Sequence, residues 1–267
     1  MHSLSIPIKR RVRDAFERAV ATYDSAAVVQ RRVGDRLLEK LAWTENGAPE
    51  NILDAGCGTG DGAGRLHRRW PGARVTGVDF APAMLALARK NADRCLAADI
   101  EKLPFAPASF GLWWSNLSIQ WCDARAAFRE AARVLEPGGR IAFSTLCPGT
   151  FAELRAAFSG IDRHRHTLHF SVPDDLRNAL EQAGLGGIRL LRERHAVFYP
   201  DLRALLRSIK DIGAQNVGEE GRQGMMGRSA WRKAAAAYEQ FRTPDGLPAS
   251  YDVLLGYAEK CEDSRFS

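Results

Sequence analysis

The 267-residue sequence lacks several features that would place it in a specialised class of protein. Its five cysteines include no C-x-x-C pair, which argues against a zinc site or a disulfide framework and favours free thiols in a reducing cytosol. No apolar run approaches the length that crosses a bilayer, and the basic segment 1–18 has no apolar signal core. Internal repeats and low-complexity tracts are also missing. The sequence therefore predicts a cytoplasmic globular protein with no membrane segment.

Basic residues outnumber acidic residues in this sequence. Lysine and arginine number 38 against 32 aspartates and glutamates, which gives a net charge of +6 and a sequence pI of about 9.2. A basic surface could meet nucleic acid, anionic lipid or an acidic protein. Because the basic residues are spread along the chain, a solvated surface without any partner explains the charge equally well.

A glycine-rich turn follows the first predicted strand, residues 51–55, and precedes a predicted helix at 61–70. Gly56, Gly58 and Gly60 allow unusual backbone angles and close approach of a ligand, toward which the helix directs its first N–H groups. The spacing differs from the G-x-G-x-x-G of dinucleotide sites, and Asp54 precedes the first glycine. A carboxylate there favours a ligand with positive charge, such as the amino-acid end and sulfonium of S-adenosylmethionine. A turn without a ligand is the alternative, since a lone glycine pattern is weak evidence.

The second predicted strand, 74–78, ends in Asp79. An acidic residue about 20 positions beyond such a loop commonly binds a pair of ribose hydroxyls, through charge-assisted hydrogen bonds. Phe80 and Met84 follow and would flank an adenine. Core packing of the helix predicted at 81–91 explains Met84 equally well.

Two further strand ends supply polar side chains. Asp99 and Ile100 follow the short strand at 94–97, where the Asp99 carboxylate can accept from the exocyclic amine of adenine. Carboxyl ends of parallel strands form the ligand-binding edge of a doubly wound sheet. After the strand at 110–115, the candidates at this edge are Asn116, Gln120 and Trp121.

Strands alternate with helices from residue 51 to residue 146, which indicates parallel βαβ units. The fifth strand is predicted at 140–145 after a turn at 137–139, and later strands at 188–198 and 251–259. Helical stretches are expected at 124–135, 150–159, 173–183, 201–212 and 229–242, with a glycine-rich loop at 211–228. The predicted organisation is an N-terminal helical arm or lid (1–48), a cofactor-binding core (49–199 and 246–262) and a helical insertion over the active site (200–245).

The N-terminal arm reads as helical over residues 9–41, with a break or cap at 21–24. Tyr23 lies at this break, where it either packs its ring and hydrates its hydroxyl or lies over the active site. His164, His166 and His169 are close in sequence, but no cysteine or carboxylate cluster accompanies them, so no metal site is predicted. His169 is the better candidate for a hydrogen-bond donor in a pocket.

These motifs together resemble those of the class I S-adenosylmethionine-dependent methyltransferases. The matching segments are residues 53–60, Asp79, Asp99-Ile100 and residues 135–140. The resemblance implies an α/β, doubly wound, Rossmann-like sheet of seven strands that are mostly parallel, with the last strand antiparallel. It also implies S-adenosyl-L-methionine as cofactor, with no metal.

A narrower resemblance covers nearly the whole chain. Residues 16–24, 115–122, 167–170, 212–216 and 246–253 are similar to the malonyl-acyl-carrier-protein O-methyltransferase family of biotin synthesis. The segments at 212–214 and 251–253 lie outside the shared methyltransferase core and therefore favour this family. It implies methyl transfer to the free carboxylate of malonyl-acyl-carrier protein, giving the malonyl methyl ester that starts pimeloyl formation.

The implied reaction limits what the site must contain. A carboxylate with a pKa near ~4 is already ionised at neutral pH, so no general base is needed. Catalysis then comes from alignment of the reacting atoms and removal of water. An arginine is expected to hold the substrate carboxylate, with Tyr23 and His169 as supporting donors beside Gln120 and Trp121.

Acyl carrier proteins are acidic as a family, which gives the basic surplus a purpose. We expect a basic rim formed by Lys9, Arg10, Arg11 and Arg13 together with the segment 200–245. Four alternatives remain: a methyltransferase of a small free metabolite, a nucleic-acid methyltransferase, a dehydrogenase and a non-catalytic binding module. The second lacks support because residues 115–118 contain no proline, and the third because of the glycine spacing.

Overall fold

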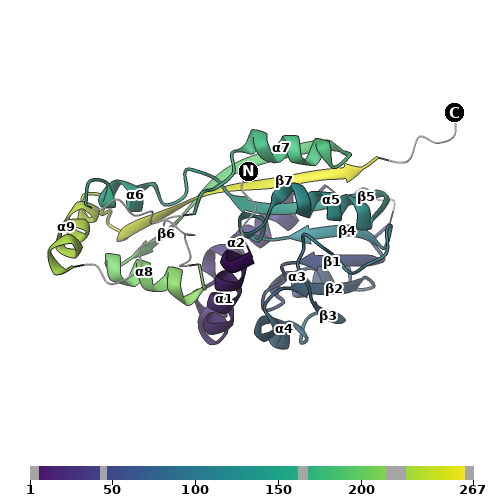
Figure 1. Ribbon diagram of the computed structural model, residues 1–267, viewed down its shortest axis with the longest axis horizontal. Helices are drawn as coiled ribbons and strands as arrows, with labels where there is room; N and C mark the ends of the chain where they lie inside the picture. Colours follow the sequence, from purple (N-terminus) through teal and green to yellow (C-terminus); the bar gives the residue numbers. More distant parts are fainter. Residues whose placement is uncertain (1–5, 43–46, 162–167, 215–226, 262–267) are drawn as a thin grey trace.

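The computed structural model describes residues 6–42, 47–161, 168–214 and 227–261, and confirms the predicted α/β fold. A seven-stranded sheet has the order β3-β2-β1-β4-β5-β7-β6, and β7 runs antiparallel to both of its neighbours (Figure 1). The other pairs are parallel. The strands are β1 Asn51–Ala55, β2 Arg74–Asp79, β3 Arg94–Ala97, β4 Phe110–Ser115, β5 Leu135–Leu146, β6 Leu185–Tyr199 and β7 Leu247–Lys260.

Helices cover both faces of this sheet. Successive strand residues point to opposite sides, so the strands present apolar side chains on both faces, and both must be covered. Ile52 joins a core beneath α2 (Val28–Lys40) and α3 (Asp61–Arg69). Its neighbour Leu53 joins a second core beneath α5 (Ala124–Val134) and α7 (Pro173–Gln182). Trp114 and Trp113 divide between the two cores in the same way, and both are fully buried. The helices are α1 Ile6–Ala26, α2 Val28–Lys40, α3 Asp61–Arg69, α4 Pro82–Ala88, α5 Ala124–Val134, α6 Ala152–Phe158, α7 Pro173–Gln182, α8 Leu202–Asp211 and α9 Arg228–Glu239, with a 3-10 turn η1 at Ile119–Trp121.

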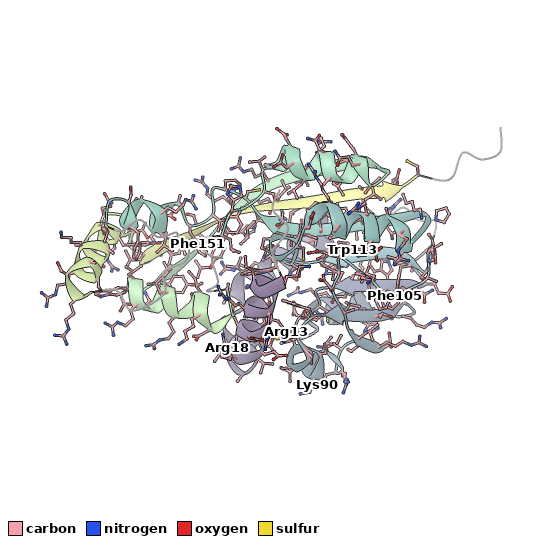
Figure 2. All side chains as sticks on the ribbon, viewed as in Figure 1. Arg13, Arg18, Lys90, Phe105, Trp113 and Phe151 are labelled. Carbon is pink, nitrogen blue, oxygen red and sulfur yellow. The ribbon has the colours of Figure 1, made fainter. Side chains whose placement is uncertain are left out.

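Strands β6 and β7 extend beyond the parallel part of the sheet and carry a small helical region (Figure 1). Helices α8 and α9 lie between these strands in sequence, and α6 packs against α9. Leu205 and Tyr238 are fully buried there. Figure 2 shows how far this region lies from the sheet centre, since Phe151 lies in the extension and Trp113 among the parallel strands. Of the predicted loop at 211–228, residues 215–226 lie outside the described ranges.

The structure corrects two predicted boundaries. Helix α1 continues through the expected break at 21–24 and ends at Ala26. Thr22 and Asp24 are not caps: their side chains bond to the Asp211 carbonyl (2.8 Å) and the Thr59 hydroxyl (2.6 Å), which lie elsewhere in the fold. Likewise, the predicted turn at 137–139 lies within β5, where the pairing register with β4 shifts.

No helix in the described part of the chain is both long enough and apolar enough to cross a membrane.

Candidate functional site

Three adjoining cavities open at the carboxyl ends of β1, β2 and β4, beneath the arm formed by α1 and α2. We call them the strand-end cavity, the glycine-loop cavity and the apolar cavity. The glycine-loop cavity is lined by Tyr23, Asp24, Ala27, Gln30, Arg31, Asp54, Gly56, Cys57, Gly58, Thr59, Asp61, Gly62, Asn91 and Asn116. Tyr23 of α1 lines all three and is the residue that their described linings have in common. The strand-end cavity is lined by Lys9, Phe16, Tyr23, Gly56, Gly58, Asp79, Phe80, Met84, Ala98, Asp99, Ile100, Leu117, Ser118, Trp121 and Cys122.

The glycine loop needs glycine for different reasons at its three positions. Gly56, Gly58 and Gly60 all have positive φ, of 76°, 53° and 89°. A Cβ at Gly56 would overlap the Ser118 side chain, whereas one at Gly58 would meet only Tyr23, at 3.9 Å. At Gly60 it would come within 2.8 Å of the Ala88 backbone. Gly56 and Gly58 line the cavities. Gly60 instead allows the glycine loop to pack closely against Ala88 at the end of α4.

Asp54, the penultimate residue of β1, is a buried carboxylate that lines the glycine-loop cavity. It is 2% exposed, and its Oδ2 atom has no hydrogen-bond partner. Burial raises the pKa of Asp54 to about 7, although the Ala63 backbone N–H and the nearby Asp79 and Asp61 also act on it. A Cβ at Gly62 would approach that oxygen to 2.6 Å, so the glycine leaves space beside it. An orphaned carboxylate oxygen fits a cationic ligand group.

Asp79 lies between the glycine loop and the start of α4. Its Oδ2 accepts from the Gly58 N–H and its Oδ1 from the Ala81 N–H, both at 2.9 Å. Burial raises the pKa of Asp79, and these backbone donors oppose that shift. Because a carboxylate has about four acceptor sites, it retains capacity for further donors in the cavity.

The remaining predicted adenine contacts come together in the strand-end cavity. Phe80, Asp99 and Ile100 line it, and Met84 lines it while being only 1% exposed, so both interpretations of Met84 fit its position. Lys9 is the unexpected member of this group. Its ammonium lies 2.7 Å from carboxylate oxygens of both Asp99 and Glu101.

Asn116, Gln120 and Trp121 occupy different walls. Asn116 lines the glycine-loop cavity and donates to the Gln30 carbonyl at 2.9 Å. Trp121 lines the strand-end and apolar cavities and stacks edge-on against Phe16, at 5.4 Å between ring centroids.

The Gln120 amide serves the loop on which it lies. It donates to the Leu117 carbonyl at 2.5 Å and accepts from the Thr145 hydroxyl at 3.2 Å. Leu117 has a positive φ of 51°, a strained conformation for a leucine. Gln120 lines the apolar cavity while holding this strained residue.

The apolar cavity has few polar groups. It is lined by Phe16, Tyr23, Val29, Gln30, Leu117, Gln120, Trp121, Leu146, Phe151, Leu168, Phe170, Ile209, Ile212, Ala214 and Tyr251. This described lining contains no arginine or lysine, so the predicted arginine partner is not among it. The Tyr23 hydroxyl makes no hydrogen bond to the described residues, and burial raises its pKa. His169 is exposed and lines none of the three cavities, although Leu168 and Phe170 do.

Several site residues were missed from the sequence because they lie on the arm. Asp24, Gln30 and Arg31 line the glycine-loop cavity, and Lys9 the strand-end cavity. One signal was available: Lys9, Phe16 and Tyr23 recur every seven residues and therefore share one face of α1.

Comparisons with known proteins agree with this geometry. A family model described as a methyltransferase domain matches residues 53–143. A malonyl-acyl-carrier-protein O-methyltransferase of Dechloromonas aromatica (strain RCB) is 46% identical over 95% of each chain. The biotin biosynthesis bifunctional protein BioHC of Cellvibrio japonicus (strain Ueda107) is 40% identical over 92% of this chain, which spans 49% of that protein.

A solved structure supports the fold alone. The geranyl diphosphate C-methyltransferase of Streptomyces coelicolor A3(2), solved with Mg²⁺, geranyl diphosphate and S-adenosyl-L-homocysteine, has a TM-score of 0.51 and 20% identity. The match covers 85% of this chain and 78% of that one.

Proposed function

This chain belongs to the malonyl-acyl-carrier-protein O-methyltransferases, and we propose that it transfers a methyl group from S-adenosyl-L-methionine to the free carboxylate of malonyl-acyl-carrier protein. The product is the malonyl methyl ester that starts pimeloyl formation in biotin synthesis. One observation carries the proposal. Tyr23 is shared by two cavities with acidic side chains, which fit a cationic nucleotide, and an apolar cavity, which fits an acyl group.

The described residues fit the cofactor, which when bound supplies a methyl group on a positively charged sulfur. Asp54 offers an unpaired buried oxygen to a cationic group, and Asp79 offers spare acceptor capacity to ribose hydroxyls. Phe80, Met84 and Ile100 form an apolar slot for a base, and Asp99 lies at its edge. Asn116 orders the end of β4 against α2 rather than presenting a free amide.

The substrate carboxylate needs no base in this site, since it is ionised at neutral pH. Methyl transfer neutralises its charge, so a dry site favours the reaction. The side chains of Phe16, Trp121 and Phe170 in the apolar cavity exclude water. The described residues therefore act by desolvation and alignment, and the protein needs no group that removes a proton.

Tyr23 is the proposed donor to the substrate carboxylate. Its hydroxyl has no hydrogen bond within the described fold, and the raised pKa keeps it protonated and able to donate. Gln120 acts as a positioning residue through Leu117 and Thr145. The arginine expected to hold the carboxylate stays a prediction.

We place carrier-protein docking on α8. Arg203, Arg207 and Lys210 are exposed at a spacing that puts them on one face of this helix, while Ile209 lines the apolar cavity from it. An acidic carrier that met this stripe would have its acyl group at the cavity. Lys9, paired inside the strand-end cavity, is not part of this surface.

A matched pair of variants tests the docking surface. R203E/R207E reverses two exposed charges on α8, and R125E/R129E reverses two on α5, which lies far along the molecule (Figure 1). The first should raise KM for malonyl-carrier protein about tenfold and reduce its dependence on salt, because steering charges act on association. The second should leave both unchanged. Equal effects of the two variants would overturn the assignment.

The function itself is tested by the release of S-adenosylhomocysteine with different acceptors. Malonyl-carrier protein should be turned over, whereas acetyl-carrier protein, which lacks the distal carboxylate, should not. A comparison with malonyl-coenzyme A measures how far the carrier itself matters. Methylation of a free small acid in preference to the malonyl thioesters would instead support the small-metabolite alternative.

A further inference from the structure

We propose that Arg31 of α2 binds the carboxylate of the cofactor's amino-acid end, opposite Asp54, so that the N-terminal arm reads whether the ligand carries an intact amino acid. This inference rests on the cofactor of the proposed function and adds a binding residue that the sequence motifs do not include. Arg31 and Asp54 line the same glycine-loop cavity from opposite elements, the arm and the end of β1.

Arg31 is the only cation in the described lining of this cavity. Its guanidinium donates to the Asp24 carbonyl and forms no ion pair with the described residues. A guanidinium has five N–H donors, so most of its capacity is left for a ligand. A planar fork of donors matches a carboxylate.

The acids that share the cavity with Arg31 are engaged elsewhere, except Asp54. Asp24 accepts from the Thr59 hydroxyl at 2.6 Å, and Asp61 forms an ion pair with Arg65 at 2.7 Å. Asp54 alone retains an orphaned, buried oxygen. The cavity therefore presents one buried carboxylate oxygen without a hydrogen-bond partner, on Asp54, and one guanidinium without an ion pair, on Arg31, whose charge is felt by Asp61. These two groups suit the ammonium and the carboxylate of a zwitterionic α-amino acid.

Arg31 lies where the N-terminal arm is held against the cofactor site. Gln30, its neighbour, accepts from Asn116 at the end of β4, and Asp24 joins α1 to the glycine loop. These contacts hold the start of α2 over the cavity. A ligand carboxylate on Arg31 would add a further link between the arm and the strand ends, so binding of the amino-acid end should stabilise the docked arm.

Ligand truncation combined with mutation tests the assignment without a turnover assay. Calorimetry would measure the binding of S-adenosylhomocysteine, which has the amino-acid end, and of 5′-methylthioadenosine, which lacks it. R31M should weaken the first about 10- to 100-fold, since it removes charge-assisted hydrogen bonds to the ligand carboxylate. It should change the second less than twofold.

The neighbouring R32M variant is the matched control. Arg32 is exposed, lines none of the three cavities and makes only a 3.4 Å contact with the Ala196 carbonyl. It should bind both ligands as the wild type does. R31K should recover part of the affinity that R31M loses, because it keeps the charge without the fork.

The outcomes separate this inference from the proposed function. Unchanged binding of S-adenosylhomocysteine by R31M, or equal weakening of both ligands, would overturn the role of Arg31. A wild-type protein that binds neither ligand would overturn the cofactor assignment and this inference with it. A protein that binds as expected but ignores malonyl-carrier protein would overturn only the choice of substrate.

Discussion

The two sides of Tyr23 are built in different ways. The cofactor side uses side chains at or just beyond the carboxyl ends of β1, β2 and β3, among them Asp54, Asp79 and Asp99, and it is rich in acids. The apolar cavity takes its walls from the arm, the loop after β4, the end of β5, Phe151 just before α6, α8 and β7, and its described lining has no charged side chain. The acidic groups of the nucleotide site are thus mainly set by local strand ends, although the arm completes both cofactor cavities. The acyl site is formed by residues from many separate parts of the fold.

The largest effect should come from breaking the cofactor side at Gly56. Gly56→Ala forces alanine into a positive φ and against Ser118, so S-adenosylhomocysteine binding should weaken more than about 100-fold, with the unfolding free energy lowered by about 2 kcal/mol. Calorimetry and denaturant unfolding measure both. Gly72→Ala, at an exposed glycine with nothing within 4 Å, is the control and should behave as the wild type.

Removing the hydroxyl of Tyr23 should lower turnover while leaving cofactor affinity nearly unchanged. Tyr23→Phe keeps the ring that lines all three cavities, so S-adenosylhomocysteine affinity should change less than about threefold. Turnover of malonyl-carrier protein should fall about 10- to 100-fold, because one hydrogen bond to a charged group is lost. Wild-type turnover in this variant would show that the Tyr23 hydroxyl takes no part in the reaction.

Cofactor affinity should depend on pH through Asp54. Burial raises the pKa of Asp54 in the folded protein to about 7, from its ordinary 3.8. The protonated carboxyl therefore stabilises the ligand-free fold in acid, and this stabilisation is lost as the pH rises through about 7. A cationic ligand group needs the ionised Asp54 carboxylate, so ligand affinity increases with pH while this contribution to fold stability decreases. S-adenosylhomocysteine affinity should therefore rise about tenfold between about pH 6 and about pH 8.

Asp54→Asn is the control for this profile, since Asp61 and Asp79 lie nearby and also have raised pKa values. The variant should bind more weakly and lose most of the rise with pH. A full rise in Asp54→Asn would assign the titration to one of those neighbours instead.

The smallest effect should come from His169→Ala. The side chain is exposed and outside the three cavities, so turnover should fall less than about threefold, as for most surface substitutions. Steady-state kinetics with malonyl-carrier protein measure it. A loss equal to that of Tyr23→Phe would support the donor role predicted for His169.

The difference between the two sides also sets what could be predicted from the sequence. Gly56, Asp79 and Asp99 were found because a strand, a turn and a polar residue are adjacent in the chain. Lys9 was assigned to an outer rim, since nothing local reveals a partner 90 residues away.

The same limit explains the misplaced end of α1. Thr22 and Asp24 are the residue types that cap helices, and only the folded chain shows that their partners are the Asp211 carbonyl and Thr59. Gln120 stays a site candidate that lines the apolar cavity, and its amide also bonds to the Leu117 carbonyl and the Thr145 hydroxyl. Contacts with distant parts of the chain thus fix the roles of Thr22 and Asp24.

Intact-protein mass spectrometry of malonyl-carrier protein tests the central claim most directly. After incubation with the enzyme and S-adenosyl-L-methionine, the carrier should gain the mass of one CH₂ on its malonyl group and lose one negative charge. A carrier of unchanged mass, from an enzyme shown by calorimetry to bind S-adenosylhomocysteine, would contradict the account.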